Sequence, residues 1–152
     1  MKILKDQQLT DNTWTFIPDG TDLPDKPIDI TISLKRWLQE QGILKKYPGK
    51  LGIRLNPEDS VDSLPPTIKN AKLIEINFPT FTDGRGFSLA KILRTHFNYK
   101  GEIRAVGQFM LDQIYYLSRV GVNAFALENK ENLADAVAMF NEFSESYQAS
   151  VN

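Results

Sequence analysis

The sequence predicts one α/β domain built on a mostly parallel β-sheet of about five βα units, with an additional N-terminal β arm. Three observations indicate this class. From Pro27 onward, short runs rich in β-branched residues alternate with amphipathic stretches, as is typical of βαβ units. The chain has 152 residues, 41% hydrophobic and 24% charged, as expected of a single globular domain. Strand-like runs recur without a shared residue pattern, so the recurrence reflects βα architecture rather than a sequence repeat.

The first 27 residues differ in composition from the rest of the chain. They are rich in Asp, Thr and Pro, and only 13–17 alternate in polarity, with Trp14 and Phe16 on one side of an expected strand. We therefore expect residues 1–27 to form an arm or hairpin added to a single α/β domain at 28–148. Residues 149–152 are expected to be a polar tail.

Five strands are expected in the main domain, because it contains five short aliphatic runs, most of them bounded by Gly, Pro or Asn. Five helices are expected between and after them, where apolar residues recur at every third or fourth position. The expected strands are 28–32, 51–55, 73–78, 102–106 and 124–127. The expected helices are 34–41, 59–64, 87–97, 108–119 and 131–147.

The ends of several helices have recognisable stop and start residues. Ser33 is the expected N-cap of the first helix, which Gly42 ends. Pro65 cuts the second helix, and Gly121 is the expected C′ residue of the fourth.

Five βα units form either an open doubly wound sheet or a half-barrel that closes by pairing with a second copy of the chain. Both arrangements bring the loops that follow the strands to one edge of the sheet. This is the edge at which α/β folds bind ligands. The candidate site is therefore expected at the carboxyl ends of the strands.

Composition excludes several classes of function. The formal net charge of −1 disfavours nucleic acids and anionic membranes as partners. There is no cysteine and only one histidine, His96, so disulfides, thiolate chemistry and a zinc site of the usual kind are not expected. The N-terminus lacks the apolar core of a signal peptide, and no run is long enough to span a bilayer, so we expect a cytoplasmic protein.

The most informative polar residues lie between the third strand and the third helix. Gly84-Arg85-Gly86 has the setting of a phosphate-binding turn, but Leu89 stands where the dinucleotide fingerprint requires a third glycine. Backbone N–H groups and Arg85 could still bind a small anion. In the alternative interpretation Asp83 caps the turn, the glycines permit unusual φ angles, and Arg85 pairs with Asp83 or Asp112.

Two further arginines fall at apolar positions, Arg94 in a helix and Arg104 in a strand. A buried guanidinium needs a carboxylate, carbonyl groups or a bound anion. We expect an internal network for Arg94, whereas Arg104 fits either a basic pocket or an internal salt bridge. No Ser, His or Lys stands at a diagnostic spacing, so no catalytic residue is assigned. The candidate binding residues are Asp83, Gly84, Arg85, Gly86, Arg104, Asp112 and Gln113.

A combination of motifs resembles the bacterial family known as domain of unknown function 934. The combination is Phe78-Pro79-x-Phe81-x-Asp83-Gly84-Arg85-Gly86-x-Ser88-x-Ala90, then Gly101-Glu102-x-Arg104-Ala105-x-Gly107, Asp112-Gln113 and Arg119-x-Gly121, and the resemblance covers residues 28–148. Members are typically encoded beside assimilatory sulfite reductase genes and are often labelled probable oxidoreductases involved in sulfite reduction. The resemblance thus implies a role in sulfur metabolism, sulfate assimilation and cysteine biosynthesis.

Three functional hypotheses follow. The first is a non-catalytic accessory protein of sulfite and sulfate reduction, which binds a partner such as sulfite reductase, or a small anion, at the carboxyl edge of the sheet. The second is a flavin- or nicotinamide-dependent oxidoreductase of sulfite reduction. The third is a structural homodimer without a small-molecule ligand. The lack of cysteine and of a complete dinucleotide fingerprint favours the first, and no cofactor is assigned.

Overall fold

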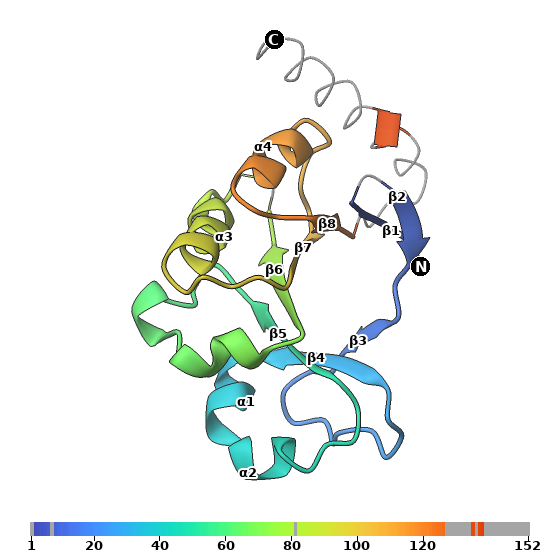
Figure 1. Ribbon diagram of the computed structural model, residues 1–152, viewed down its shortest axis with the longest axis vertical. Coiled ribbons are helices and arrows are strands. Elements are labelled where there is room, and N and C mark those ends of the chain that lie inside the picture. The colour runs from blue at the N-terminus through green and yellow to red at the C-terminus, as the bar shows by residue number, and fades with distance from the viewer. Residues whose placement is uncertain (1, 7, 81, 127–134, 136, 139–152) are drawn as a thin grey trace.

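The computed structural model describes residues 2–6, 8–80, 82–126, 135 and 137–138, and Figure 1 shows how their elements are arranged. The strands are β1 (Lys2–Lys5), β2 (Gln8–Asp11), β3 (Trp14–Phe16), β4 (Asp29–Ser33), β5 (Leu51–Leu55), β6 (Leu73–Phe78), β7 (Glu102–Gly107) and β8 (Ala124–Phe125). The helices are α1 (Leu34–Gln39), α2 (Gln41–Leu44), α3 (Arg85–Thr95) and α4 (Gln113–Arg119), with 3₁₀ turns η1 (Val61–Ser63) and η2 (Pro66–Asn70).

The predicted α/β class is confirmed, but the prediction of about five parallel βα units needs correction. The described residues form one sheet of eight strands in the order β2-β1-β8-β7-β6-β5-β4-β3. Strands β3 to β8 pair in parallel, whereas β1 pairs antiparallel with both β2 and β8. The additional strands come from the N-terminal arm. β3 confirms the strand expected at 13–17, whereas β1 and β2 are runs of four residues that are too short to show a clear strand period.

The sheet is curled into a half-barrel, as the short link between its two edges requires. β2 and β3 are the edge strands, and only Asn12 and Thr13 separate them along the chain. Such a link spans at most about 11 Å between Cα atoms, whereas a flat sheet of this width would place its edges about 34 Å apart. The N-terminal segment therefore crosses the open side of the half-barrel, opposite the helices (Figure 1).

The main core lies between the convex face of the sheet and the helices. Alternate residues of the central strands, such as Ile74 and Ile103, are fully buried there, and α3 adds Leu93. Because successive side chains of a strand point to opposite faces, the intervening residues Glu75 and Arg104 face the concave side. The fold thus separates an apolar convex face from a concave face that carries charges.

Several boundaries differ from the prediction for local reasons. The expected helix 59–64 is replaced by η1 and η2, because Pro65-Pro66 interrupts the chain there. Gly42 lies inside α2 instead of ending a helix. The expected helix 108–119 begins only at Gln113, since Gly107 has a φ of +94° and the N–H of Gln108 donates to the carbonyl of Phe78 at 2.7 Å.

Other local predictions are confirmed. The Ser33 hydroxyl caps α1 by accepting a hydrogen bond from the N–H of Arg36 at 3.2 Å. Gly121 follows α4 with a φ of +108°, as a C′ glycine does. Most of the expected helix 131–147, Leu127 and the expected tail 149–152 lie outside the described residues. Within the described ranges, no helix has the length and apolar character needed to cross a membrane.

Candidate functional site

The loop after β6 holds Asp83 and Arg85 together as an ion pair. Nε and Nη2 of Arg85 donate to Oδ1 and Oδ2 of Asp83 at 3.0 and 2.7 Å, and the N–H of Arg85 donates to Oδ1 at 3.1 Å. The hydrogen bonds from the Arg85 side chain and backbone lower the pKa of Asp83. The Arg85 side chain is 62% exposed, whereas that of Asp83 is only 16% exposed. A largely buried carboxylate therefore holds a solvent-exposed arginine in place.

Of the two glycines in this loop, one has a packing role and neither has an unusual φ. Gly84 has a φ of −82°, so the expectation that both glycines serve unusual backbone angles is wrong. Gly86 is buried in the first turn of α3, and a Cβ atom there would lie 2.5 Å from the ring of Phe78. Gly86 therefore allows α3 to approach β6 closely.

Acidic groups surround this edge of the sheet. Glu58, in the loop after β5, acts electrostatically on Arg85, and the Asp59 carboxylate accepts a hydrogen bond from the N–H of Asn56 at 2.7 Å. Burial raises the pKa of Asp59. Together with Asp83, these carboxylates make the edge a poor setting for a small anion.

The start of α4 contributes Asp112 and Gln113 separately from the Asp83–Arg85 pair. Asp112 is exposed and occupies the N-cap position without a side-chain capping hydrogen bond. The Oε1 atom of Gln113 accepts a hydrogen bond from the N–H of Met110 at 2.8 Å. Arg85 thus pairs with Asp83 and not with Asp112, the other partner that the sequence suggested.

An aromatic cluster underlies the loops at this edge. Phe78 contacts Phe87 and Phe109 edge-to-face with ring centroids 6.1 Å apart in both pairs, and Phe109 contacts Phe125 at 6.0 Å. Next to Phe109, the side chain of Met110 is an exposed hydrophobic group, 48% accessible. The edge therefore combines a rigid apolar base with exposed polar and apolar groups.

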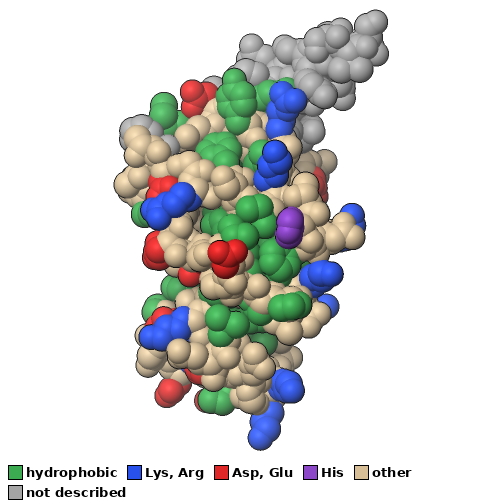
Figure 2. Space-filling model, turned by 90° about the vertical axis from the view of Figure 1, so that its left-hand side faces the viewer, with side chains coloured by type: hydrophobic (Ala, Val, Ile, Leu, Met, Phe, Trp, Pro, Cys, Tyr) green, Lys and Arg blue, Asp and Glu red, His purple; other side chains and the backbone are tan. Residues whose placement is uncertain are grey.

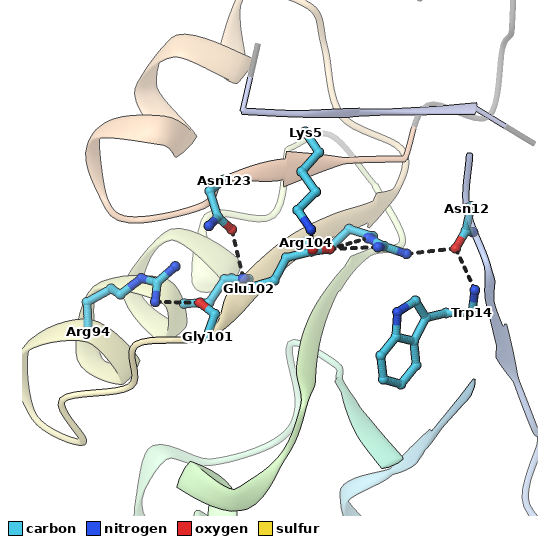
Figure 3. A network of polar contacts seen from close by, with 9 residues as sticks. Lys5, Asn12, Trp14, Arg94, Gly101, Glu102, Arg104 and Asn123 are labelled. Carbon is cyan, nitrogen blue, oxygen red and sulfur yellow. Dashed lines mark hydrogen bonds and ion pairs between the residues drawn. The ribbon is translucent and has the colours of Figure 1, made fainter. Parts of the chain in front are cut away.

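Arg104 lies on the concave face, apart from the loop residues, and is almost fully buried. Its Nε and Nη2 atoms donate to Oε2 of Glu102 at 2.9 and 2.6 Å, and Nη1 donates to Oδ1 of Asn12 at 2.8 Å (Figure 3). Lys5 pairs with Oε1 of the same glutamate at 2.8 Å. Asn12 also accepts a hydrogen bond from the N–H of Trp14, so the network joins β7 to the segment between β2 and β3.

A second charged pair, Arg54–Glu75, lies next to Arg104 on the concave face. Glu75 is 3% exposed and accepts a hydrogen bond from Nε of Arg54 at 3.1 Å. The Arg54 guanidinium also stacks on the ring of Phe16, 4.1 Å from its centroid. Glu75 is the cross-strand neighbour of both Arg54 and Arg104. Sequence reasoning did not select Arg54 or Glu75, although each is a charge inside an otherwise apolar strand.

Arg94 fulfils the expectation of an internal role, but its partners are carbonyl groups. It donates to the backbone oxygens of Tyr99, Gly101 and Gly121 at 2.7–3.0 Å. Burial lowers the pKa of its guanidinium. His96 lies at the end of α3 and is exposed. Across the ranges that the structure describes, no group of three or more His, Asp and Glu side chains is placed to hold a metal ion.

The comparisons with known proteins bear on the family alone. Neither the curated proteins nor the solved structures give a match. Residues 52–152 match a family described as "Bacterial protein of unknown function (DUF934)". The match begins at β5, later in the chain than the resemblance at 28–148 suggested, and it includes every candidate binding residue. The chain therefore belongs to this bacterial family of proteins of unknown function.

Proposed function

We propose that the protein is a non-catalytic accessory protein of assimilatory sulfite and sulfate reduction, which binds a partner protein at the edge where β5, β6 and β7 end. The observation that supports this most directly is the exposed Arg85, which Asp83 holds in place at the same edge of the sheet as the exposed Met110 and the aromatic cluster. Arginine, methionine and aromatic side chains are enriched in protein interfaces, and a pre-oriented arginine loses little entropy on binding.

The charges at this edge favour a protein partner over a small anion. Arg85 is the cation of the Asp83–Arg85 pair, while Glu58 and Asp59 add two further carboxylates nearby. A free oxyanion would compete with Asp83 for the same guanidinium and would meet repulsion from its neighbours. A protein partner can instead place an apolar group against Met110 and accept hydrogen bonds from the exposed Arg85 guanidinium with neutral carbonyl groups, so it brings no negative charge to this acidic edge.

The internal pairing of the charged candidate residues also argues for an accessory, non-catalytic role. Asp83 and Arg85 are engaged with each other, and Arg104 is engaged with Glu102 and Asn12. A general acid or base needs a group that can exchange a proton with substrate, whereas these groups serve to hold a surface in shape. The connection to sulfite reduction comes from the family resemblance in sequence, and sulfite reductase is the partner that it suggests.

Binding to purified sulfite reductase tests the proposal, with charge reversals on α3 as matched variants. We expect Arg85→Glu to weaken binding about tenfold or more, as loss of an interface anchor does. Lys91→Glu makes the same charge change at another exposed position of α3 and should alter the affinity less than twofold.

Equal effects of the two substitutions, or no binding by the unaltered protein, would contradict the proposal. A thermal-shift measurement with flavins and nicotinamides separates the oxidoreductase hypothesis. A saturable shift that is lost in Arg85→Ala would support that enzyme instead.

A further inference from the structure

A pocket of about 400 Å³ lies at the opposite edge of the sheet, where β5 and β6 begin. Its walls come from α1, α2, η2 and the residues that precede the two strands. None of the candidate residues at the carboxyl edge lines it. Its volume falls in the range of small-molecule sites.

The inner surface of the pocket is apolar and fixed. Trp37, Leu44 and Leu51 line it, and Leu44 is only 6% exposed. The indole N–H of Trp37 donates to Oγ1 of Thr67 at 3.1 Å, which ties α1 to η2 across the pocket. Such a surface suits a flat apolar or aromatic group.

The rim of the pocket is cationic. Lys45 is the C-cap of α2, Lys50 precedes β5 and Lys72 precedes β6, and all three line the pocket. None of the lining residues carries a carboxylate. In the part of the chain that the structure describes, none of these lysines forms an ion pair, whereas Lys5 and Arg104 are both paired with Glu102.

The surrounding surface reinforces this positive potential. Lys46, Lys69 and Lys100 are also exposed in segments that lead into the strands at this edge. In Figure 2, Lys and Arg side chains predominate on the side of the helical face that carries the histidine, and Asp and Glu predominate on the other side. A concave site lined by charges of one sign concentrates ligands of the opposite sign.

We infer that this pocket binds a small amphipathic anion, with an apolar or aromatic body against Trp37, Leu44 and Leu51 and a carboxylate, sulfonate or phosphate group held by Lys50 and Lys72. The ligand would join the apolar wall and the lysine rim, which neither inorganic sulfate nor a neutral hydrocarbon can do. This site is separate from the proposed partner surface, and its ligand does not depend on that proposal.

Two dyes that share most of their apolar framework provide the test. 1-Anilinonaphthalene-8-sulfonate carries a sulfonate, and N-phenyl-1-naphthylamine lacks it. Both are titrated by fluorescence into the folded protein, whose packing is checked by near-ultraviolet circular dichroism. We expect saturable binding of the sulfonate dye, weakened about tenfold in Lys50→Gln/Lys72→Gln because two charge contacts are lost. Binding of the neutral dye should change less than twofold.

The control is Lys69→Gln/Lys100→Gln, which removes the same charge from the same edge outside the pocket lining. It should leave the affinity for the sulfonate dye within twofold. Equal losses in the two double variants would show only a long-range charge effect and would overturn the inference. An equal loss of the neutral dye, or no saturable binding of the sulfonate dye, would also overturn it.

Discussion

Arg104 is a charged residue that is almost fully buried on the concave face. Its side chain is only 3% exposed, and an unpaired charge there would cost several kcal/mol. Glu102 and Asn12 together occupy all three of its nitrogen atoms, and Lys5 shares the glutamate. The residue therefore holds the first strands of the chain against β7.

Replacing this residue tests its structural role. We expect Arg104→Met to lower the free energy of unfolding by about 2–3 kcal/mol, because a buried carboxylate loses its main partner. The expected cost is below that of an isolated buried pair, since Lys5 still compensates Glu102. Urea denaturation measures the change. Arg85→Met, at an exposed ion pair, should have a much smaller effect, and equal effects would contradict the assigned role.

At the level of secondary structure, the contact between α3 and β6 positions the proposed partner surface. Gly86 makes this contact possible, since a Cβ atom would meet the Phe78 ring at 2.5 Å and the Ile76 side chain at 3.1 Å. At Gly84, two residues earlier, an added Cβ atom would meet no other group within 4 Å, and the φ of Gly84 is an ordinary −82°. The two glycines thus form a natural pair of test and control.

Alanine at these two positions should have different consequences. Gly86→Ala is expected to destabilise the protein by about 1–3 kcal/mol, because α3 or the Phe78 ring must move. Gly84→Ala is expected to change stability by no more than about 0.5 kcal/mol, since the backbone gain and the weaker N-cap oppose each other. Thermal or urea unfolding of both variants decides the matter. A destabilisation by Gly84→Ala as large as that by Gly86→Ala would refute this account.

The central elements were predictable from sequence because their signals are local. The boundaries of β5 and β6 agree with the prediction, since each is an aliphatic run ended by Asn56 or Pro79. The strand β3 falls within the strand expected at 13–17, whereas β1 and β2 were not predictable to the same degree. The position of β1 beside β8, and of β2 and β3 at the two edges, depends on pairing between strands that are distant in sequence, and this pairing leaves no signal in such short runs.

The same distinction between local and long-range signals applies to the candidate site. The Asp83–Arg85 pair was one of the expected alternatives, because residues two apart in a turn can meet. The partner of Arg104 on the N-terminal segment was not expected, since Asn12 lies 92 residues away in sequence. Arg54 and Glu75 left only a weak signal, a single charge at a position that alternates with buried aliphatic residues.

At the scale of the whole molecule, the chain brings the two edges of its own sheet together. The link 12–13 joins β2 and β3, so the half-barrel does not need a second copy to bring its edges close. The charges are also divided between the two ends of the strands, with carboxylates after β5 and β6 and lysines before them. The proposed partner surface and the inferred anion pocket therefore lie at ends of opposite charge.

The N-terminal strands should be integral to this molecule even though the family match begins at residue 52. Leu4 of β1 is 1% exposed and belongs to the main core, while Leu9 of β2 is 45% exposed. We expect Leu4→Ala to cost about 2–4 kcal/mol through lost burial and a residual cavity. Leu9→Ala should cost less than about 1 kcal/mol.

Both variants are measured by urea denaturation followed through the tryptophans and through far-ultraviolet circular dichroism. If the arm and the main domain form one cooperative unit, the two signals coincide and shift together in Leu4→Ala. If the arm is only an appendage, Leu4→Ala and Leu9→Ala will have equally small effects on the main transition. That result would mean that the half-barrel is stable without its first strands, and that Lys5 and Asn12 are dispensable for holding Arg104 in the sheet.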